Sequence, residues 1–253
     1  MCWFLCYEGQ MDRTFIVGDI HGDIDALETL MSRLPELDIG DTLVFLGDYL
    51  DRGPASAEVV EAIRVRIPEQ VDAKVVALRG NHEDAWLQVI DEGWPGFVLP
   101  PNNGCRQCLR SFRPEIEPRE ENILLLTGSF FPADVVQWMR SLPYFYEDSQ
   151  GIYVHAGLSR IDGRWPHPSE VENLRELLWI RSQDFFANYD GKTIVVGHTV
   201  TRTLPPDLDK FTPEDPDDMF WAGKGAYAID TGAGKGGFLT ALELPAGNVY
   251  ESR

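Results

Sequence analysis

Short apolar runs that end abruptly in glycine and polar residues recur along the chain. Each run is rich in Val, Ile, Leu and Phe, and runs of this length bounded by Gly and polar groups are typical of buried strands. The polar residues that follow them are Asp, Asn and His, so metal-binding residue types stand at the end of the predicted strands. The runs are Thr14–Asp19, Thr42–Asp48, Lys74–His82, Gly151–Gly157 and Lys192–His198.

Helical periodicity separates these strands. It covers Ile24–Leu34, Ser56–Ile67, Asp84–Ile90, Ala133–Leu142 and Val171–Leu178. Strands that alternate with helices predict an α/β fold built in layers. Three later segments, Ala226–Asp230, Gly237–Leu244 and Asn248–Glu251, are predicted to form an antiparallel meander because short Gly, Pro and Asn turns join them. The expected fold is α/β with mixed sheets.

The chain has no linker or repeat that divides it, so residues 11–253 are predicted to form one domain. Residues 1–10 are interpreted as an arm of uncertain status, and residues 207–218 as an acidic loop. Residues 93–122 are rich in Pro, Gly and charged side chains and are expected to be an irregular insert near the site.

Composition limits the possible partners. The 253 residues carry 22 Lys+Arg against 41 Asp+Glu, a formal charge of −19. No basic cluster is present to meet phosphates, which argues against nucleic-acid and anionic-membrane partners. Four cysteines are too few for a disulfide scaffold, and no window approaches the ~20 apolar residues of a membrane span. We therefore expect a cytoplasmic protein.

The strand ends supply two carboxylates, one amide oxygen and three imidazoles. Taken singly, each of these groups has an ordinary structural interpretation as a turn or a core residue, but three motifs in fixed order, GDIHG, GDYLDRG and GNHE, make coincidence remote. Mixed oxygen and imidazole donors suit Mn²⁺, with Fe or Zn²⁺ as alternatives. Six ligands exceed what one open metal site uses, so we predict two divalent ions. The predicted metal ligands are Asp19, His21, Asp48, Asn81, His155 and His198.

These motifs, with the later HAGL and VVGHT, resemble the phosphoprotein phosphatases of the calcineurin-like metallophosphoesterase superfamily. The resemblance runs from about Phe15 to Leu244 and is nearest to small bacterial and phage enzymes, through LLWIRSQDF (Leu177–Phe185) and DTGAGKGGFLTALEL (Asp230–Leu244). It implies a central β-sandwich of mixed sheets flanked by helices, with a two-metal site at the strand ends. It also implies a phosphoric monoester hydrolase that acts on a phosphorylated protein or peptide.

The resemblance implies roles residue by residue. Asp19, His21 and Asp48 would hold the first ion, and Asp48 would bridge to a second ion completed by Asn81, His155 and His198, although the ion that receives each later histidine stays open. His82 would protonate the leaving group, and Asp51 would orient His82. Arg52 and Arg181 would bind phosphate oxygens, with Asn81 beside them. The residues with implied roles outside the metal set are His82, Asp51, Arg52 and Arg181.

Three hypotheses about function follow. The first is a serine/threonine protein phosphatase, in which a metal-bridging water attacks phosphorus in line. Asp51 favours it, because the related symmetrical dinucleoside tetraphosphatases typically carry Ala in the corresponding triplet. The second is such a tetraphosphatase, or a broad-specificity phosphatase that also accepts phosphotyrosine and small esters. The third, a non-catalytic binding module, is disfavoured because the set of ligands, acid and clamp is complete.

Two further features are interpreted as incidental. Cys105 and Cys108 form a CxxC with no second CxxC or His pair to complete a zinc site. Within the resemblance, Cys105 stands where an Asn-Gly-Gly helix-start motif has its second Gly. His167 lies away from every strand end and is expected at the surface.

Overall fold

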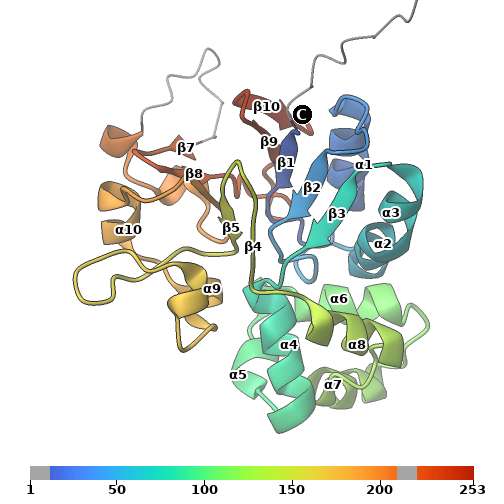
Figure 1. Ribbon diagram of the computed structural model, residues 1–253. Coiled ribbons are helices and arrows are strands. Elements are labelled where there is room, and N and C mark those ends of the chain that lie inside the picture. Colours follow the sequence, from blue (N-terminus) through green and yellow to red (C-terminus); the bar gives the residue numbers. More distant parts are fainter. Residues whose placement is uncertain (1–11, 210–220) are drawn as a thin grey trace, which may run out of the picture.

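Two five-stranded sheets form the centre of the computed structural model, which describes residues 12–209 and 221–253 (Figure 1). The first sheet has the order β10-β9-β1-β2-β3 and the second β4-β5-β6-β8-β7. The predicted arm 1–10 and most of the acidic loop 207–218 lie outside the described residues. The strands are β1 Thr14–Val17, β2 Thr42–Phe45, β3 Lys74–Ala77, β4 Phe145–Glu147, β5 Ile152–Val154, β6 Ile194–Val196, β7 Trp221–Ala222, β8 Ala226–Ala228, β9 Thr240–Leu244 and β10 Asn248–Glu251.

Both sheets are mixed, as expected. In the first, β1, β2 and β3 are parallel, while β9 and β10 run antiparallel along its other edge. In the second, β5, β6 and β8 are parallel, and β4 and β7 close the edges antiparallel. The expected meander is therefore correct for β9 and β10 but wrong for β8. This strand, Ala226–Ala228, lies instead between β6 and the edge strand β7 of the second sheet.

The sheets pack face to face around a buried apolar layer, which confirms the predicted sandwich. Two further apolar clusters fill the outer faces, between each sheet and its helices. The layer between the sheets includes Ile16, Val44 and Leu242 from the first sheet and Tyr153 and Val195 from the second.

Helices cover the outer faces and one end of the sandwich. In Figure 1, α1, α2 and α3 lie beside the first sheet, α4 to α8 gather at the end of the sheets, and α9 and α10 lie beside the second sheet. None of the described helices is long and apolar enough to cross a bilayer. The helices are α1 Ile24–Arg33, α2 Ser56–Glu61, the π-helix η1 Ala62–Arg66, α3 Ile67–Gln70, α4 Asn81–Glu92, α5 Pro95–Val98, α6 Cys105–Phe112, α7 Pro118–Thr127, α8 Ala133–Ser141, α9 Glu176–Trp179 and α10 Gln183–Asn188; short 3₁₀ turns are η2 Pro101–Asn103, η3 Pro168–Glu170, η4 Thr201–Thr203 and η5 Pro206–Leu208.

The segment 93–122 is more regular than its composition suggested. It contains α5, η2, α6 and the start of α7. Proline stands at the start of α5 and α7, where the missing N–H costs no helical hydrogen bond. Leu109 and Cys108 of α6 are buried in the core of the first sheet. The Pro and Gly residues therefore begin and end short helices here and do not prevent them.

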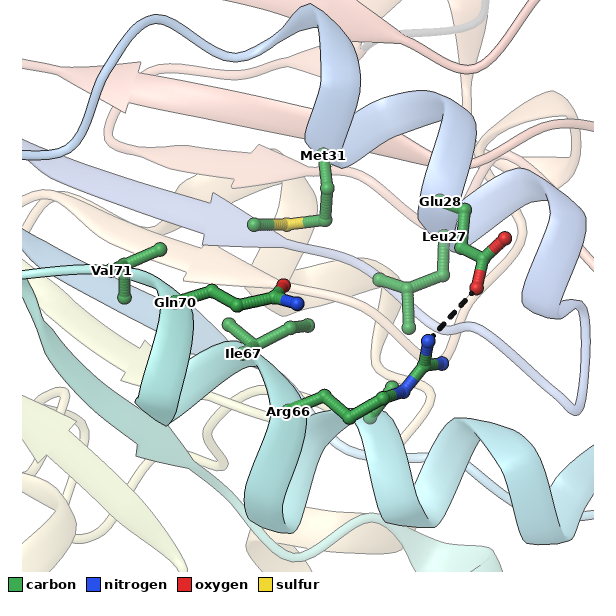
Figure 2. A pocket seen from close by; sticks show the side chains of 8 residues that line it. Leu27, Glu28, Met31, Arg66, Ile67, Gln70 and Val71 are labelled. Atoms are coloured by element: carbon green, nitrogen blue, oxygen red, sulfur yellow. Dashed lines mark hydrogen bonds and ion pairs between the residues drawn. The ribbon is translucent and has the colours of Figure 1, made fainter.

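A hollow of about 240 Å³ lies between α1 and the η1–α3 segment (Figure 2). Its floor is apolar, with Leu27, Met31, Ile67 and Val71, and Arg66 forms an ion pair of 3.2 Å with Glu28 at one side. None of the predicted site residues lines this hollow.

Candidate active site

The predicted site residues meet where strands of both sheets end. Asp19 and His21 follow β1, Asp48 follows β2, Asn81 opens α4 after β3, His155 follows β5 and His198 follows β6. All six side chains are buried. The carboxyl ends of parallel strands share one edge of a sheet, and packing the two sheets face to face brings the two edges together. The six predicted ligands therefore lie together in one buried cluster.

Asp48 occupies the centre of this cluster. Its Oδ2 lies 3.3 Å from His21 Nε2, and its Oδ1 lies 3.5 Å from His155 Nε2. Two groups of side chains that could each hold an ion share Asp48, one with His21 and His82 and the other with His155 and His198. Because one oxygen of Asp48 faces each group, this carboxylate could bridge two ions.

The remaining candidates divide between the two sides. Asn81 Oδ1 lies 2.9 Å from His155 Nε2 and 2.8 Å from His198 Nδ1, so these three side chains converge on one point. On the other side, Asp19 Oδ2 lies 3.8 Å from His21 Nε2. Asp19 also accepts the backbone N–H of His198 at 3.0 Å, which ties the two sheets together at the cluster. This geometry favours placing both later histidines with Asn81.

The electrostatics of the cluster fit divalent cations. The Nε2 atoms of His21 and His198 are buried and have no hydrogen-bond partner among the described residues. Burial lowers the pKa of both imidazoles, which keeps them neutral as metal ligands must be. Burial also raises the pKa of Asp19, and the nearby charges of Asp230 and Asp48 raise it further. Bound cations would offset that repulsion and use the free imidazole nitrogens.

His82 and Asp51 form a buried pair beside the cluster. His82 Nδ1 lies 2.6 Å from Asp51 Oδ2, and Trp86 Nε1 donates to both Asp51 oxygens at 3.0 Å. The ring of Phe97 packs edge-on against His82 at 5.4 Å. Burial opposes the charge on His82, but Asp48 and Asp51 outweigh it and raise the pKa of the imidazole. The predicted pairing of an acid with its orienting carboxylate thus has the necessary geometry.

Both predicted phosphate-binding arginines lie at the cluster. An Arg52 terminal nitrogen is 3.4 Å from His82 Nε2, and Arg52 Nε is buried without a hydrogen-bond partner among the described residues. Arg181 donates to the carbonyl oxygen of His198 at 3.5 Å, a long contact that leaves donors of the guanidinium for another acceptor. The two guanidinium groups therefore reach the cluster from the loop after β2 and from the segment between α9 and α10, respectively.

The backbone at the site is strained. Among the described non-glycine residues with positive φ, all but Asp162 belong to the site. Such conformations cost on the order of 1–3 kcal/mol each and persist where the surrounding structure enforces them. Here they turn side chains inward from tight strand-end loops, a feature that sequence analysis did not predict. The strained residues are His21 (φ 49°), Asp48 (φ 55°), Asp51 (φ 71°), Arg52 (φ 66°) and His198 (φ 62°).

Glu83, to which the sequence pattern assigned no role, is a buried carboxylate that positions the loops of the site. Its buried carboxylate accepts backbone N–H groups of Asp48 and Tyr49 at 2.9 Å and of Gly80 at 3.0 Å. It therefore fixes the loop after β2 against the start of α4. Burial and the charge of Asp48 raise the pKa of Glu83 to about 7. Its position as the last residue of the GNHE motif is the feature of the sequence that could have identified Glu83.

Lys235 and Asp230 form a second pair that was missed. Asp230 follows β8, the same position relative to a strand that the predicted ligands occupy, and it is fully buried. Its Oδ2 accepts from Lys235 Nζ at 3.2 Å, and the lysine side chain is only 14% exposed. The stretch DTGAGKGG after this strand was the signal in the sequence.

The residues interpreted as incidental lie outside the cluster. Cys105 and Cys108 are free and buried in α6, and burial raises the pKa of both thiols. His167 is partly exposed and lies 2.8 Å from Glu147, as an ordinary surface residue can.

A buried cluster of imidazole, carboxylate and amide side chains, flanked by arginines and a His–Asp pair at the edge of a two-sheet sandwich, is the arrangement expected of a metal-dependent phosphoesterase. The model of the calcineurin-like phosphoesterase family matches residues 13–222. The chain belongs to this family, whose members use a two-metal site.

Curated relatives include two enzymes named symmetrical bis(5'-nucleosyl)-tetraphosphatase. The one from Baumannia cicadellinicola is 29% identical over 64% of this chain and 49% of its own length. The one from Chromohalobacter salexigens is 26% identical over 94% of this chain and 96% of its own. A Caenorhabditis elegans protein named "putative serine/threonine-protein phosphatase" is 39% identical, but over only 27% of this chain and 18% of its own. This chain thus spans about half the length of the first relative.

Solved structures show the same fold. One, described as a "putative diadenosine tetraphosphatase", has a TM-score of 0.58 and 22% identity, covering 95% of this chain and 93% of its own. The cold-active protein-tyrosine phosphatase of a Shewanella species has a TM-score of 0.55 and 18% identity, covering 96% of this chain and 81% of its own. At these identities the likeness extends to the fold alone.

Proposed function

We propose that this protein is a two-metal phosphohydrolase that cleaves dinucleoside tetraphosphates. The metal ligands are Asp19, His21, Asp48, Asn81, His155 and His198. One observation carries the choice of substrate: the similarity to a named tetraphosphatase extends over 94% of this chain and 96% of that relative. The sequence similarity to the C. elegans protein named as a putative serine/threonine-protein phosphatase covers only 27% of this chain.

The residues at the cluster supply what such a hydrolysis needs. Divalent ions bound there would neutralise the phosphate charge and activate the attacking water. Arg52 and Arg181 would bind phosphate oxygens, because a planar guanidinium matches their geometry. His82 would donate the proton at Nε2 to the leaving oxygen, while Asp51 holds the opposite nitrogen at 2.6 Å.

A second candidate, a serine/threonine protein phosphatase, is favoured by this same His82–Asp51 pair. The alkoxide of serine is a poor leaving group and needs a proton, whereas a nucleoside diphosphate leaves more easily. A carboxylate that orients the acid is therefore of most use for a phosphomonoester.

A competition assay separates the two candidates. Metal-stripped protein is reconstituted with Mn²⁺ and offered diadenosine tetraphosphate and a phosphoserine peptide together, with chelation as the control. A higher kcat/KM for the dinucleotide supports the proposed function. A higher kcat/KM for the peptide overturns it in favour of the second candidate. Failure on both substrates with metal bound overturns both.

A further inference from the structure

A polar pocket of about 250 Å³ adjoins the active site on the side of Arg52. We call it the Lys235 pocket. It lies between the loop after β2, the start of α6 and the glycine-rich loop after β8. Its lining includes Arg52, Asn102, Gly104, Gln107, Gly234 and Lys235.

The walls of this pocket are fixed by two close backbone contacts. A Cβ on Gly104, which has φ +78°, would lie 2.1 Å from the backbone nitrogen of Arg52. A Cβ on Gly234, with φ +68°, would lie 2.4 Å from the carbonyl oxygen of His21. Only glycine fits at such approaches. The pocket is therefore attached directly to the loops that carry a proposed metal ligand and the proposed phosphate clamp.

The charge of the pocket is opposite to that of the protein. The chain has a formal charge of −19, yet the pocket has two cations, and none of the described residues that line it is acidic. Lys235 is held in place by the buried carboxylate of Asp230 at 3.2 Å. An ammonium has three donors, so this bond leaves others for a ligand. Asn102 and Gln107 add amide donors.

Arg52 connects the pocket to the reacting centre. Its guanidinium reaches to 3.4 Å from His82 Nε2, the nitrogen that would protonate the leaving oxygen. The same residue lines the pocket, and its buried Nε has no hydrogen-bond partner among the described residues. A phosphate group bound in the pocket would thus lie next to the leaving oxygen of the substrate. The volume is several times the roughly 30 Å³ of a water molecule, enough for more than one phosphate group.

We propose that the Lys235 pocket binds the phosphates of the leaving nucleoside diphosphate, an inference that rests on the proposed function. In the reaction, the water oxygen loses a proton and bonds to phosphorus, the central anhydride P–O bond breaks, and its electron pair leaves on the diphosphate oxygen, which takes the proton of His82 while the other phosphate oxygens stay charged. Lys235 and Arg52 stabilise that charge, so Lys235 determines preference for polyphosphate substrates over simple esters.

The test compares Lys235→Met and Gln107→Leu with wild type. Lys192→Met is the matched control, because Lys192 also pairs with a carboxylate, Glu147 at 2.9 Å, but lies outside the pocket. Inhibition of p-nitrophenyl phosphate hydrolysis by tripolyphosphate and by inorganic phosphate is measured at constant free Mn²⁺. Wild type and Lys192→Met should prefer tripolyphosphate, and Lys235→Met should lose about tenfold of that preference. Gln107→Leu should lose less, and it keeps the test valid if unpairing Asp230 unfolds the lysine variant.

A second readout is the ratio of kcat/KM for diadenosine tetraphosphate to that for p-nitrophenyl phosphate, which should also fall about tenfold in Lys235→Met. An unchanged tripolyphosphate preference in both pocket variants, or no preference in wild type, would overturn the pocket assignment. Failure of wild type on diadenosine tetraphosphate would instead overturn the proposed function. The tripolyphosphate comparison would then still decide whether the pocket binds polyphosphate.

Discussion

His82 Nδ1 lies 2.6 Å from Asp51 Oδ2, and both groups are buried beside the carboxylate of Asp48. The contact fixes which nitrogen of His82 faces the cluster. With Nδ1 bound to Asp51, Nε2 is directed to the place where Arg52 also points, 3.4 Å away. Trp86 holds Asp51 from the other side, so the orientation of the imidazole is set by contacts outside the metal ligands.

Replacing His82 should therefore affect substrates according to their leaving groups. In His82→Asn, hydrolysis of an alkyl phosphate should fall by about 10²- to 10⁴-fold, because this leaving group needs the proton. Hydrolysis of p-nitrophenyl phosphate should fall much less. Steady-state kcat/KM on both substrates checks this, and equal losses would assign His82 to substrate binding.

In Asp51→Asn, kcat/KM should again fall more for an alkyl phosphate than for p-nitrophenyl phosphate. The fall should be smaller than in His82→Asn, because the imidazole remains but is less well oriented. Asp134→Asn is a suitable control, since Asp134 is an exposed carboxylate paired with Arg64 at 2.8 Å. A loss in Asp51→Asn that is the same for all leaving groups would contradict the positioning role.

The shared position of Asp48 leads to a prediction about metal content. Its two oxygens face His21 at 3.3 Å and His155 at 3.5 Å, so Asp48→Asn should weaken both ion sites together. After reconstitution with Mn²⁺ and dialysis, elemental analysis should find about two ions per wild-type chain and fewer than one per variant chain. Asp91→Asn, at an exposed carboxylate paired with Arg140, should retain the wild-type content. Full occupancy in Asp48→Asn would disprove the bridging role.

Gly104 offers a test of how α6 supports Arg52. In Gly104→Ala the new methyl group would lie 2.1 Å from the Arg52 nitrogen, so the loop carrying Arg52 has to shift. We expect kcat/KM for p-nitrophenyl phosphate to fall at least about tenfold through misplacement of the clamp. Gly163→Ala has the same φ of +78° with no atom within 4 Å of its Cβ, so it isolates the cost of the backbone conformation. Equal activity in both variants would rule out the contact as the cause.

Much of this cluster could be predicted from sequence because its side chains follow apolar strands directly. The run FIVGD places Asp19 at the end of β1, and VVGH places His198 at the end of β6, whatever the helices between them do. Lys235 could not be predicted in the same way. Its proposed role depends on Asp230, on the contact of Gly234 with the loop of His21, and on the contact of Gly104 with the loop of Arg52, which no local pattern encodes.

Most strands of the fold could be predicted for the same reason, but the predictions for the pairing of β8 and for residues 93–122 were wrong. Hydrophobic periodicity identified β8 as a strand but gave no information about its neighbours. The strand Ala226–Ala228 lies parallel to β6 and antiparallel to β7, both of them in the second sheet. In residues 93–122, Pro and Gly were interpreted as breakers, whereas they stand at helix ends.

A last prediction concerns stability away from the active site, where Arg13 fixes the starts of β1 and β2. Arg13 Nε donates to Asp41 Oδ1 at 3.1 Å, and the backbone N–H of Asp38 donates to Oδ2 at 2.9 Å. Burial by itself would raise the pKa of Asp41, but these hydrogen bonds outweigh it and the pKa is lowered. A carboxyl group whose pKa is lower in the folded state stabilises the fold above its unfolded pKa of about 3.9. That contribution is lost as the pH falls through the folded pKa.

Asp41→Asn should therefore reduce the free energy of unfolding by about 1.5–3 kcal/mol at pH 7, the range for hydrogen bonds to a charged group. Urea unfolding of wild type and variant at pH 7, 5, 4 and 3 should show the difference shrinking only below about pH 4. Asp134→Asn removes a carboxylate that is also paired with an arginine but exposed, and solvent screening should make its effect smaller at every pH. A difference that is constant from pH 7 to pH 3 would mean that Asp41 stabilises the strand starts through packing and its neutral hydrogen bonds. The lowered pKa would then have no part in its effect.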